Sequence, residues 1–97
     1  MKTTNLVLID HFCSNCDVDI SFITSLNEYG IIDMIVEEDK KYISNEQLKT
    51  IERAIHFHYE LNINLEGIDV IHNLLTQISD LQEELRITKN KVNFLRL

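Results

Sequence analysis

The sequence predicts a mainly α protein with a small winged helix-turn-helix head and one long C-terminal helix. Three observations predict this fold. Apolar residues recur in heptads through the last third of the chain, short amphipathic segments separated by turn residues fill the rest, and the 97 residues include two Gly and no Pro. Helix is favoured where the residues that interrupt it are scarce. We therefore expect a head over residues 1–64 and a long helix over residues 65–97.

The head is predicted to open with two short helices joined by an acidic turn. Residues 9–16 form the first helix and residues 20–29 the second. Asp19 or Asp17 caps the second helix, and Gly30 ends it in a left-handed conformation. The apolar spacing predicts the following inward-facing side chains: Phe12, Cys13, Cys16, Ile20, Ile23 and Leu26.

A small β-hairpin wing is predicted after the second helix. Residues 31–36 and 42–43 form its strands, and residues 38–41 form a polar turn between them. Short apolar runs that flank a polar turn are typical of a hairpin. Residues 3–8 are a lead that is long enough for one further short strand.

A third helix is predicted over residues 45–61. Ser44 followed by Gln47 has the spacing of a capping box at its start. Its apolar stripe consists of Leu48, Ile51 and Ile55. Asn64 is placed to cap the long helix that follows, and Gly67 in the first turn of that helix permits a close backbone approach.

The long helix, predicted over residues 65–96, carries a heptad ladder. Residues 71, 78, 85 and 92 share one position and residues 74, 81, 88 and 95 the other, at the alternating spacing of a coiled coil. All but Thr88 are apolar, and we call these seven the seam: Ile71, Leu74, Ile78, Leu81, Leu85, Val92 and Leu95. The seam predicts a homodimer, either parallel or antiparallel. The alternative is that the helix folds back on its own head.

Charge indicates the kind of partner. The net charge is −7, no Lys or Arg occurs from Thr3 to Asp39, and none occurs from Ala54 to Leu85. Phosphate backbones and anionic lipids are bound through Lys and Arg. The composition therefore disfavours direct binding of nucleic acid or a membrane and favours a basic protein partner.

Residues 56–85, HFHYELNINLEGIDVIHNLLTQISDLQEEL, resemble the chaperone modulators of the CbpM family, whose head is of the MerR type. Upstream, the stretch IDHFCSNCDVDISFITSLNEYGII has the helix, acidic turn, helix, Gly and strand order of that head, so the resemblance covers nearly the whole chain. The matching positions are Tyr59, Glu60, Leu61, Gly67, Ile68, Val70, Leu74, Ile78, Leu81 and Glu84. One position departs from the family: Tyr59 stands where a His often precedes Glu-Leu.

The resemblance implies a regulatory binding protein that binds the J-domain of a CbpA/DnaJ-like co-chaperone and inhibits its stimulation of DnaK. J-domains present a basic helix to DnaK, which agrees with the acidic charge found here. We expect Tyr59, Glu60, Glu66 and Asp69, which lie around the break between the last two helices, to converge as the partner-binding residues. The alternatives are a MerR-like transcriptional regulator and a structural dimerisation module.

Other chemistry has little support in the sequence. Cys13 and Cys16 have a spacing that suits metal or a redox disulfide, but no second Cys pair exists, so two buried thiols are expected. His56 and His58 point to different faces of a helix, which disfavours a metal site there. No nucleophile elbow or phosphate-binding loop is present. We expect no enzyme activity, no cofactor and a cytoplasmic location.

Overall fold

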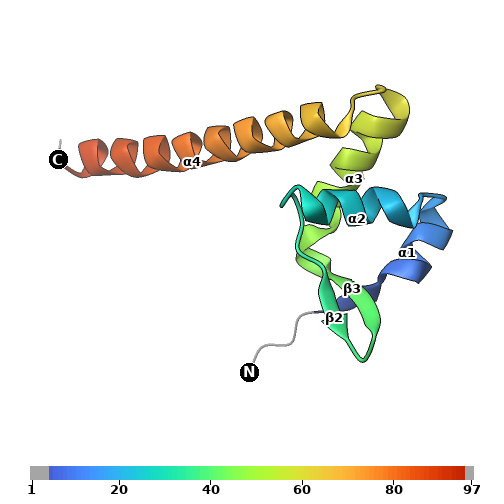
Figure 1. The fold of residues 1–97 in the computed structure, drawn as a ribbon. Helices are drawn as coiled ribbons and strands as arrows, with labels where there is room; N and C mark the ends of the chain where they lie inside the picture. The colour runs from blue at the N-terminus through green and yellow to red at the C-terminus, as the bar shows by residue number, and fades with distance from the viewer. Residues whose placement is uncertain (1–4, 96–97) are drawn as a thin grey trace.

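The computed structural model describes residues 5–95 of the chain. The predicted lead residues Thr3 and Thr4 and the predicted helix end at Arg96 lie outside this range. The elements in chain order are β1 (Leu6–Leu8), α1 (Ile9–Cys16), α2 (Ile20–Glu28), β2 (Ile35–Glu37), β3 (Lys40–Ser44), η1 (Asn45–Gln47), α3 (Leu48–Ile55), η2 (His56–Glu60) and α4 (Leu65–Leu95). Figure 1 shows a small head from which α4 projects. The predicted fold class, a mainly α winged helix-turn-helix head with a long C-terminal helix, is confirmed.

The turn between α1 and α2 has a left-handed residue at Asp17, with φ of 57°. Asp19 occupies the N-cap position of α2, but its side chain makes no capping hydrogen bond. Gly30 takes a φ of +78° after α2, and its amide donates to the Asn27 carbonyl at 3.0 Å. The left-handed end of this helix, which the glycine predicted, is therefore confirmed.

Two inward-facing residues were predicted wrongly. Cys16 is exposed at the last position of α1, while Cys13 is buried. Ile20 is 47% exposed, and Phe22 packs in the core instead. The buried arc of α2 is centred on Leu26, and Ile20 lies about 120° from that centre at about 100° per residue.

The three strands form one antiparallel sheet in the order β1-β3-β2. Leu6 pairs with Ser44 and Ile35 pairs with Tyr42. Glu38 and Asp39, with φ of 50° and 66°, make a two-residue turn that is tighter than the predicted one. The predicted first strand of the wing, residues 31–36, was too long, since β2 begins at Ile35. Ile31 and Ile32 belong to the core and precede the strand.

The predicted third helix consists of three successive pieces. A 3₁₀ turn, η1, opens it, α3 follows, and the π-helical turn η2 ends it. The predicted capping box does not form, since Ser44 makes no side-chain capping bond. The Gln47 side-chain amide donates to the Asp33 carbonyl at 2.8 Å and to Ser44 Oγ at 3.2 Å, and it accepts from the Asp33 backbone amide at 2.6 Å. Gln47 thus ties the start of this helical segment to the chain that enters the wing.

The core lies where α1, α2, α3 and β3 meet, and α4 adds one residue to it. Its buried hydrophobic residues are Ile9, Phe12, Cys13, Val18, Phe22, Ile23, Leu26, Ile31, Ile32, Ile43, Ile51, Ala54 and Ile68. The bend before α4 is tight at Gly67, where an added Cβ would lie 2.8 Å from Ile63 Cγ2. The Asn64 Oδ1 atom accepts from the Gly67 amide at 2.8 Å, as the predicted cap requires.

Candidate functional site

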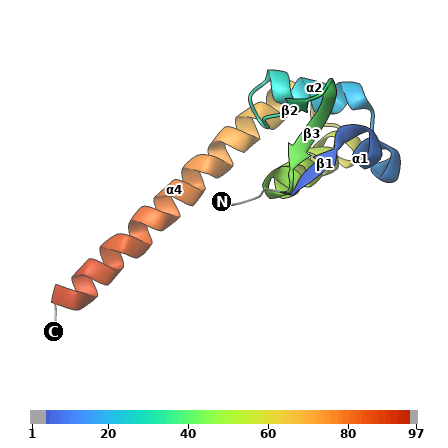
Figure 2. The same ribbon diagram turned by 90° about the horizontal axis from the view of Figure 1, so that it is seen from below.

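The seam lies open on α4. Its residues from Leu74 to Leu95 are between 45% and 79% exposed, and Ile71 is half-buried. Figures 1 and 2 show no other described element beside the outer half of α4. The alternative in which this helix folds back on its own head therefore does not describe the structure. An apolar stripe of this length exposed to water is typical of an interaction surface.

The end of α2 meets the first turn of α4 through a hydrogen bond. The Tyr29 hydroxyl donates to Glu66 Oε2 at 3.1 Å, and Tyr29 remains 38% exposed. This bond to Glu66 raises the pKa of Tyr29 above its ordinary value, and the charges of Glu66, Asp69 and Glu28 act in the same direction. Glu28 precedes Tyr29 in the chain, and Asp69 lies about one helical turn after Glu66 in α4, so the bond brings these carboxylates to one end of α2. We call these four residues, Glu28, Tyr29, Glu66 and Asp69, the acidic face.

Tyr59 has different surroundings. Its hydroxyl oxygen accepts from the Asp19 amide at 3.4 Å, and its ring meets Phe22 edge-on with centroids 5.5 Å apart. The neighbouring His58 stacks on Phe22 at 4.7 Å, and His58 Nδ1 lies 3.1 Å from the Ile63 carbonyl oxygen. The π-helical turn η2 thus packs aromatic side chains on α2, beside the bend that leads into α4.

Glu60 makes a different contact. Its Oε1 atom lies 2.8 Å from His56 Nδ1, one turn earlier in the same segment. Of the four predicted partner-binding residues, Glu66 and Asp69 lie about one turn apart at the start of α4, while Tyr59 contacts α2 and Glu60 pairs with His56.

Sequence reasoning did not include Glu28 and Tyr29 among the partner-binding residues. They lie 37 or more positions before Glu66 in the chain. Glu28 and Tyr29 come just before Gly30, and this glycine indicates where α2 ends. It does not indicate which later segment packs beside that helix end. This half of the acidic face could therefore be found only in the tertiary structure.

The acidic face offers hydrogen-bond acceptors and one aromatic ring. Glu28 and Glu66 are exposed and Asp69 is half-buried, and Val70 beside them is 56% exposed. Carboxylates form their strongest pairs with Arg and Lys, and Tyr is enriched at protein interfaces. The arrangement therefore suits a basic, partly apolar protein surface.

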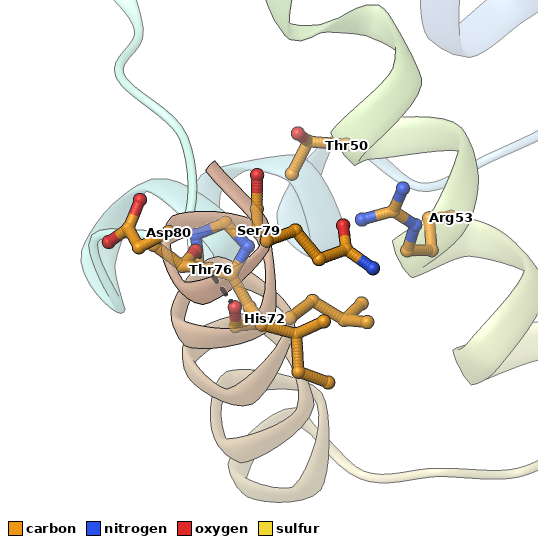
Figure 3. Close-up of a pocket in the computed structure, with 9 residues that line it drawn as sticks. Thr50, Arg53, His72, Thr76, Ser79 and Asp80 are labelled. Atoms are coloured by element: carbon orange, nitrogen blue, oxygen red, sulfur yellow. Dashed lines mark hydrogen bonds between the residues drawn. The ribbon is translucent and has the colours of Figure 1, made fainter. Parts of the chain in front are cut away.

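A separate open groove lies between α3 and α4. It has a volume of about 490 Å³ and is lined by Thr50, Arg53, His72, Leu75, Thr76, Ile78, Ser79, Asp80 and Gln82. Figure 3 shows Thr50 and Arg53 of α3 across from the polar side chains of α4, where Thr76 Oγ1 donates to the His72 carbonyl at 3.0 Å.

Within residues 5–95 no cluster of His, Cys, Asp and Glu is arranged to hold a metal ion.

Comparison with known proteins shows which family has this fold. The family described as "MerR HTH family regulatory protein" matches residues 7–90, which is most of the chain. The chain belongs to this MerR helix-turn-helix family. A chaperone modulatory protein CbpM of Pseudomonas entomophila is 24% identical over 95 residues, covering 95% of this chain and 94% of the relative. A CbpM of Pseudomonas putida is 25% identical over the full length of both chains.

These relatives confirm the resemblance to the CbpM family, and the match to MerR proteins confirms the predicted type of head. The names of both groups describe regulatory or modulatory proteins and no enzyme. Among the described residues no helix combines the length and apolar composition needed to cross a bilayer. The relatives themselves are named chaperone modulatory proteins.

Proposed function

We propose that this chain binds the J-domain of a CbpA/DnaJ-like co-chaperone and inhibits its stimulation of DnaK. The acidic face is the observation that carries the proposal. It joins carboxylates of α2 and α4 around Tyr29, whose hydroxyl is bonded to Glu66 at 3.1 Å. A basic helix of the kind that J-domains present to DnaK is complementary to it in charge.

The absence of nearby cations supports this docking site. Residues 54–85 contain no Lys or Arg, so the carboxylates of α4 near the head have no cationic neighbour in that stretch. Opposite potentials increase the rate of encounter and disfavour partners of the wrong charge. The hydrogen bond between Tyr29 and Glu66 restricts both side chains before binding, which reduces the entropy that association costs.

The proposed mechanism is competition. A J-domain whose basic helix lies on the acidic face cannot present the same helix to DnaK, so its stimulation of the ATPase is lost. Tyr59 and Glu60 have contacts separate from the acidic face and remain proposed partner contacts. The seam provides the proposed homodimer, since Ile or Val at one heptad position and Leu at the other favour two strands.

Calorimetric titration with an isolated CbpA-type J-domain tests the proposal. We expect saturable binding that weakens between low and moderate salt, together with loss of J-domain stimulation in a DnaK ATPase assay. The double substitution Glu66→Lys and Asp69→Lys should weaken binding at least tenfold. The matched control, Glu46→Lys with Glu52→Lys, makes the same charge change on exposed positions of η1 and α3 and should bind normally.

A duplex DNA titration tests the alternative of a transcriptional regulator. The helix-turn-helix family favours that alternative, but α2 contains no Lys or Arg and β2 places Glu37 opposite Lys40 in the wing. Salt-sensitive DNA binding without J-domain binding would support the regulator and reject the modulator. Absence of binding to both would leave the structural dimerisation module.

A further inference from the structure

We infer that the bound J-domain extends from the acidic face into the open groove between α3 and α4, where Arg53 binds an acidic side chain of the J-domain. This contact rests on the proposed function and adds a second point of recognition for the same partner. It follows from the position of the groove beside the acidic face and from the charge of Arg53.

The groove continues the acidic face along one side of α4. At about 100° per residue, Thr76 and Asp80 each lie within about 20° of Asp69 around the helix. Both residues line the groove. Thr76 follows Asp69 by seven residues, which is about 10 Å along the axis at 1.5 Å per residue. A segment of the partner that lies on Asp69 and runs along this side of α4 therefore enters the groove.

Arg53 is the cation that lines the groove. It is exposed on α3, and Figure 3 shows its guanidinium directed towards the polar side chains of α4. Neither ion pair found within residues 5–95 includes Arg53. A guanidinium binds a carboxylate through two parallel hydrogen bonds, which gives the pair a defined geometry as well as a favourable energy. Arg53 is therefore placed to bind a carboxylate that the partner supplies.

The rest of the groove suits the same kind of side chain. Ala54 and Ile68, both 2% exposed, line a small recess that Arg53 also lines. Thr50 and Ser79 add hydroxyl groups to the groove, and a hydroxyl can donate to a carboxylate. The volume of about 490 Å³ is in the range of sites that enclose small ligands, so a side chain of the partner has room to enter.

The acidic face and the groove select opposite charges. Glu66 and Asp69 attract basic side chains, whereas Arg53 in the adjoining groove selects an acidic one. A partner segment that is basic throughout satisfies the acidic face and places a cation against Arg53. The two preferences together therefore fix the direction in which the partner lies on the head, and Arg53 acts as a selectivity residue.

The charge reversal Arg53→Glu separates this contact from general attraction. The chain becomes more acidic, so attraction between net charges alone would strengthen the binding of a basic partner. Loss of the proposed contact instead predicts that an isolated CbpA-type J-domain binds at least about tenfold more weakly in calorimetry. The matched control, Lys49→Glu, makes the same change one turn earlier on α3, outside the groove, and should bind at least as tightly as the unaltered protein.

A double-mutant cycle identifies the carboxylate on the partner. Each Asp and Glu of the J-domain is changed in turn to Asn or Gln. One of these changes should weaken binding to the unaltered protein and have no effect on binding to Arg53→Ala. Circular dichroism spectra of the variants, which carry changes at exposed positions, should equal that of the unaltered protein.

Three results would overturn the contact and keep the proposed function, provided that Glu66→Lys with Asp69→Lys still weakens binding. The first is binding by Arg53→Glu that equals or exceeds that of the unaltered protein. The second is an equal loss for Arg53→Glu and Lys49→Glu. The third is a cycle in which no carboxylate of the J-domain couples to Arg53. No binding by the unaltered protein rejects the proposed function and this contact together.

Discussion

The Tyr29 hydroxyl at the end of α2 donates a hydrogen bond to Glu66 in the first turn of α4, at 3.1 Å. This contact joins two segments that are 37 residues apart in the chain. It lies on the surface of the head, where Tyr29 and Glu66 are both exposed. The bond also raises the pKa of Tyr29, which a titration can measure.

Tyr29 should titrate at a higher pH than an unperturbed tyrosine. Bonding to the Glu66 carboxylate raises its pKa in the folded state, so the folded protein holds this proton more tightly than the unfolded chain. The contribution to stability is complete below the unfolded pKa of about 10 and is lost as the pH rises through the folded pKa. Ultraviolet absorbance titration of the phenolates measures this.

The substitution Tyr29→Phe should remove a phenolate signal that titrates above the ordinary tyrosine pKa, and Glu66→Gln should shift that signal to lower pH. The same variants should lose less stability than the unaltered protein when the pH is raised past 10. A titration curve for Tyr29→Phe that differs only in amplitude, with the high-pH signal still present, contradicts the assignment of that signal to Tyr29.

The cap at the start of α4 should be worth a measurable amount of stability. Asn64→Ala removes the side-chain oxygen that accepts from the Gly67 amide at 2.8 Å, and loss of such a cap costs about 1 kcal/mol. Urea denaturation monitored by circular dichroism measures the change. Asn64→Ser should retain most of the stability, and Asn90→Ala in the exposed part of α4 should lose none.

The two isoleucines of α2 should differ sharply. Ile23 is fully buried, so Ile23→Ala should lower the free energy of unfolding by about 2–5 kcal/mol. Ile20 is 47% exposed, so Ile20→Ala should cost well under half as much. Equal costs in chemical denaturation would mean that Ile20 faces the core, as its spacing from Ile23 and Leu26 first predicted.

Charge placed in the seam should separate the two copies while the head stays folded. Leu81 and Leu85 are 62% and 59% exposed and lie outside the core of the head, so Asp at either position leaves that core intact. A buried unpaired carboxylate between two helices would be costly. Sedimentation velocity should therefore report a monomer for Leu81→Asp, and a profile identical to that of the unaltered protein would reject the seam as the dimer interface.

Much of the fold could be predicted because local patterns determine it. The heptad spacing and the scarcity of helix breakers predicted α4, which begins at Leu65 as expected. Gly30 and Asn64 marked a helix end and a helix start, and both positions have the predicted geometry. These signals act over a few residues, so they can be recognised in the sequence alone.

Predictions that required a particular neighbour were less successful. Ser44 and Gln47 have the spacing of a capping box, but the Gln47 amide bonds to the backbone of Asp33 instead. Cys16 has a helical spacing from Cys13 that suits burial, yet it is exposed because no element covers that end of α1 within the described residues. In both cases a contact distant in sequence, or its absence, outweighed the local pattern.

The sequence by itself determined the mainly α architecture, the heptad seam and the acidic balance, because periodicity and charge are properties of the chain before it folds. Only the tertiary structure decided that the end of α2 meets the start of α4. The Tyr29 hydroxyl there bonds to Glu66, 37 residues later in the chain. The physical reason is that this arrangement depends on how the bend at Asn64 and Gly67 directs α4 past the end of α2, and no local pattern contains that angle.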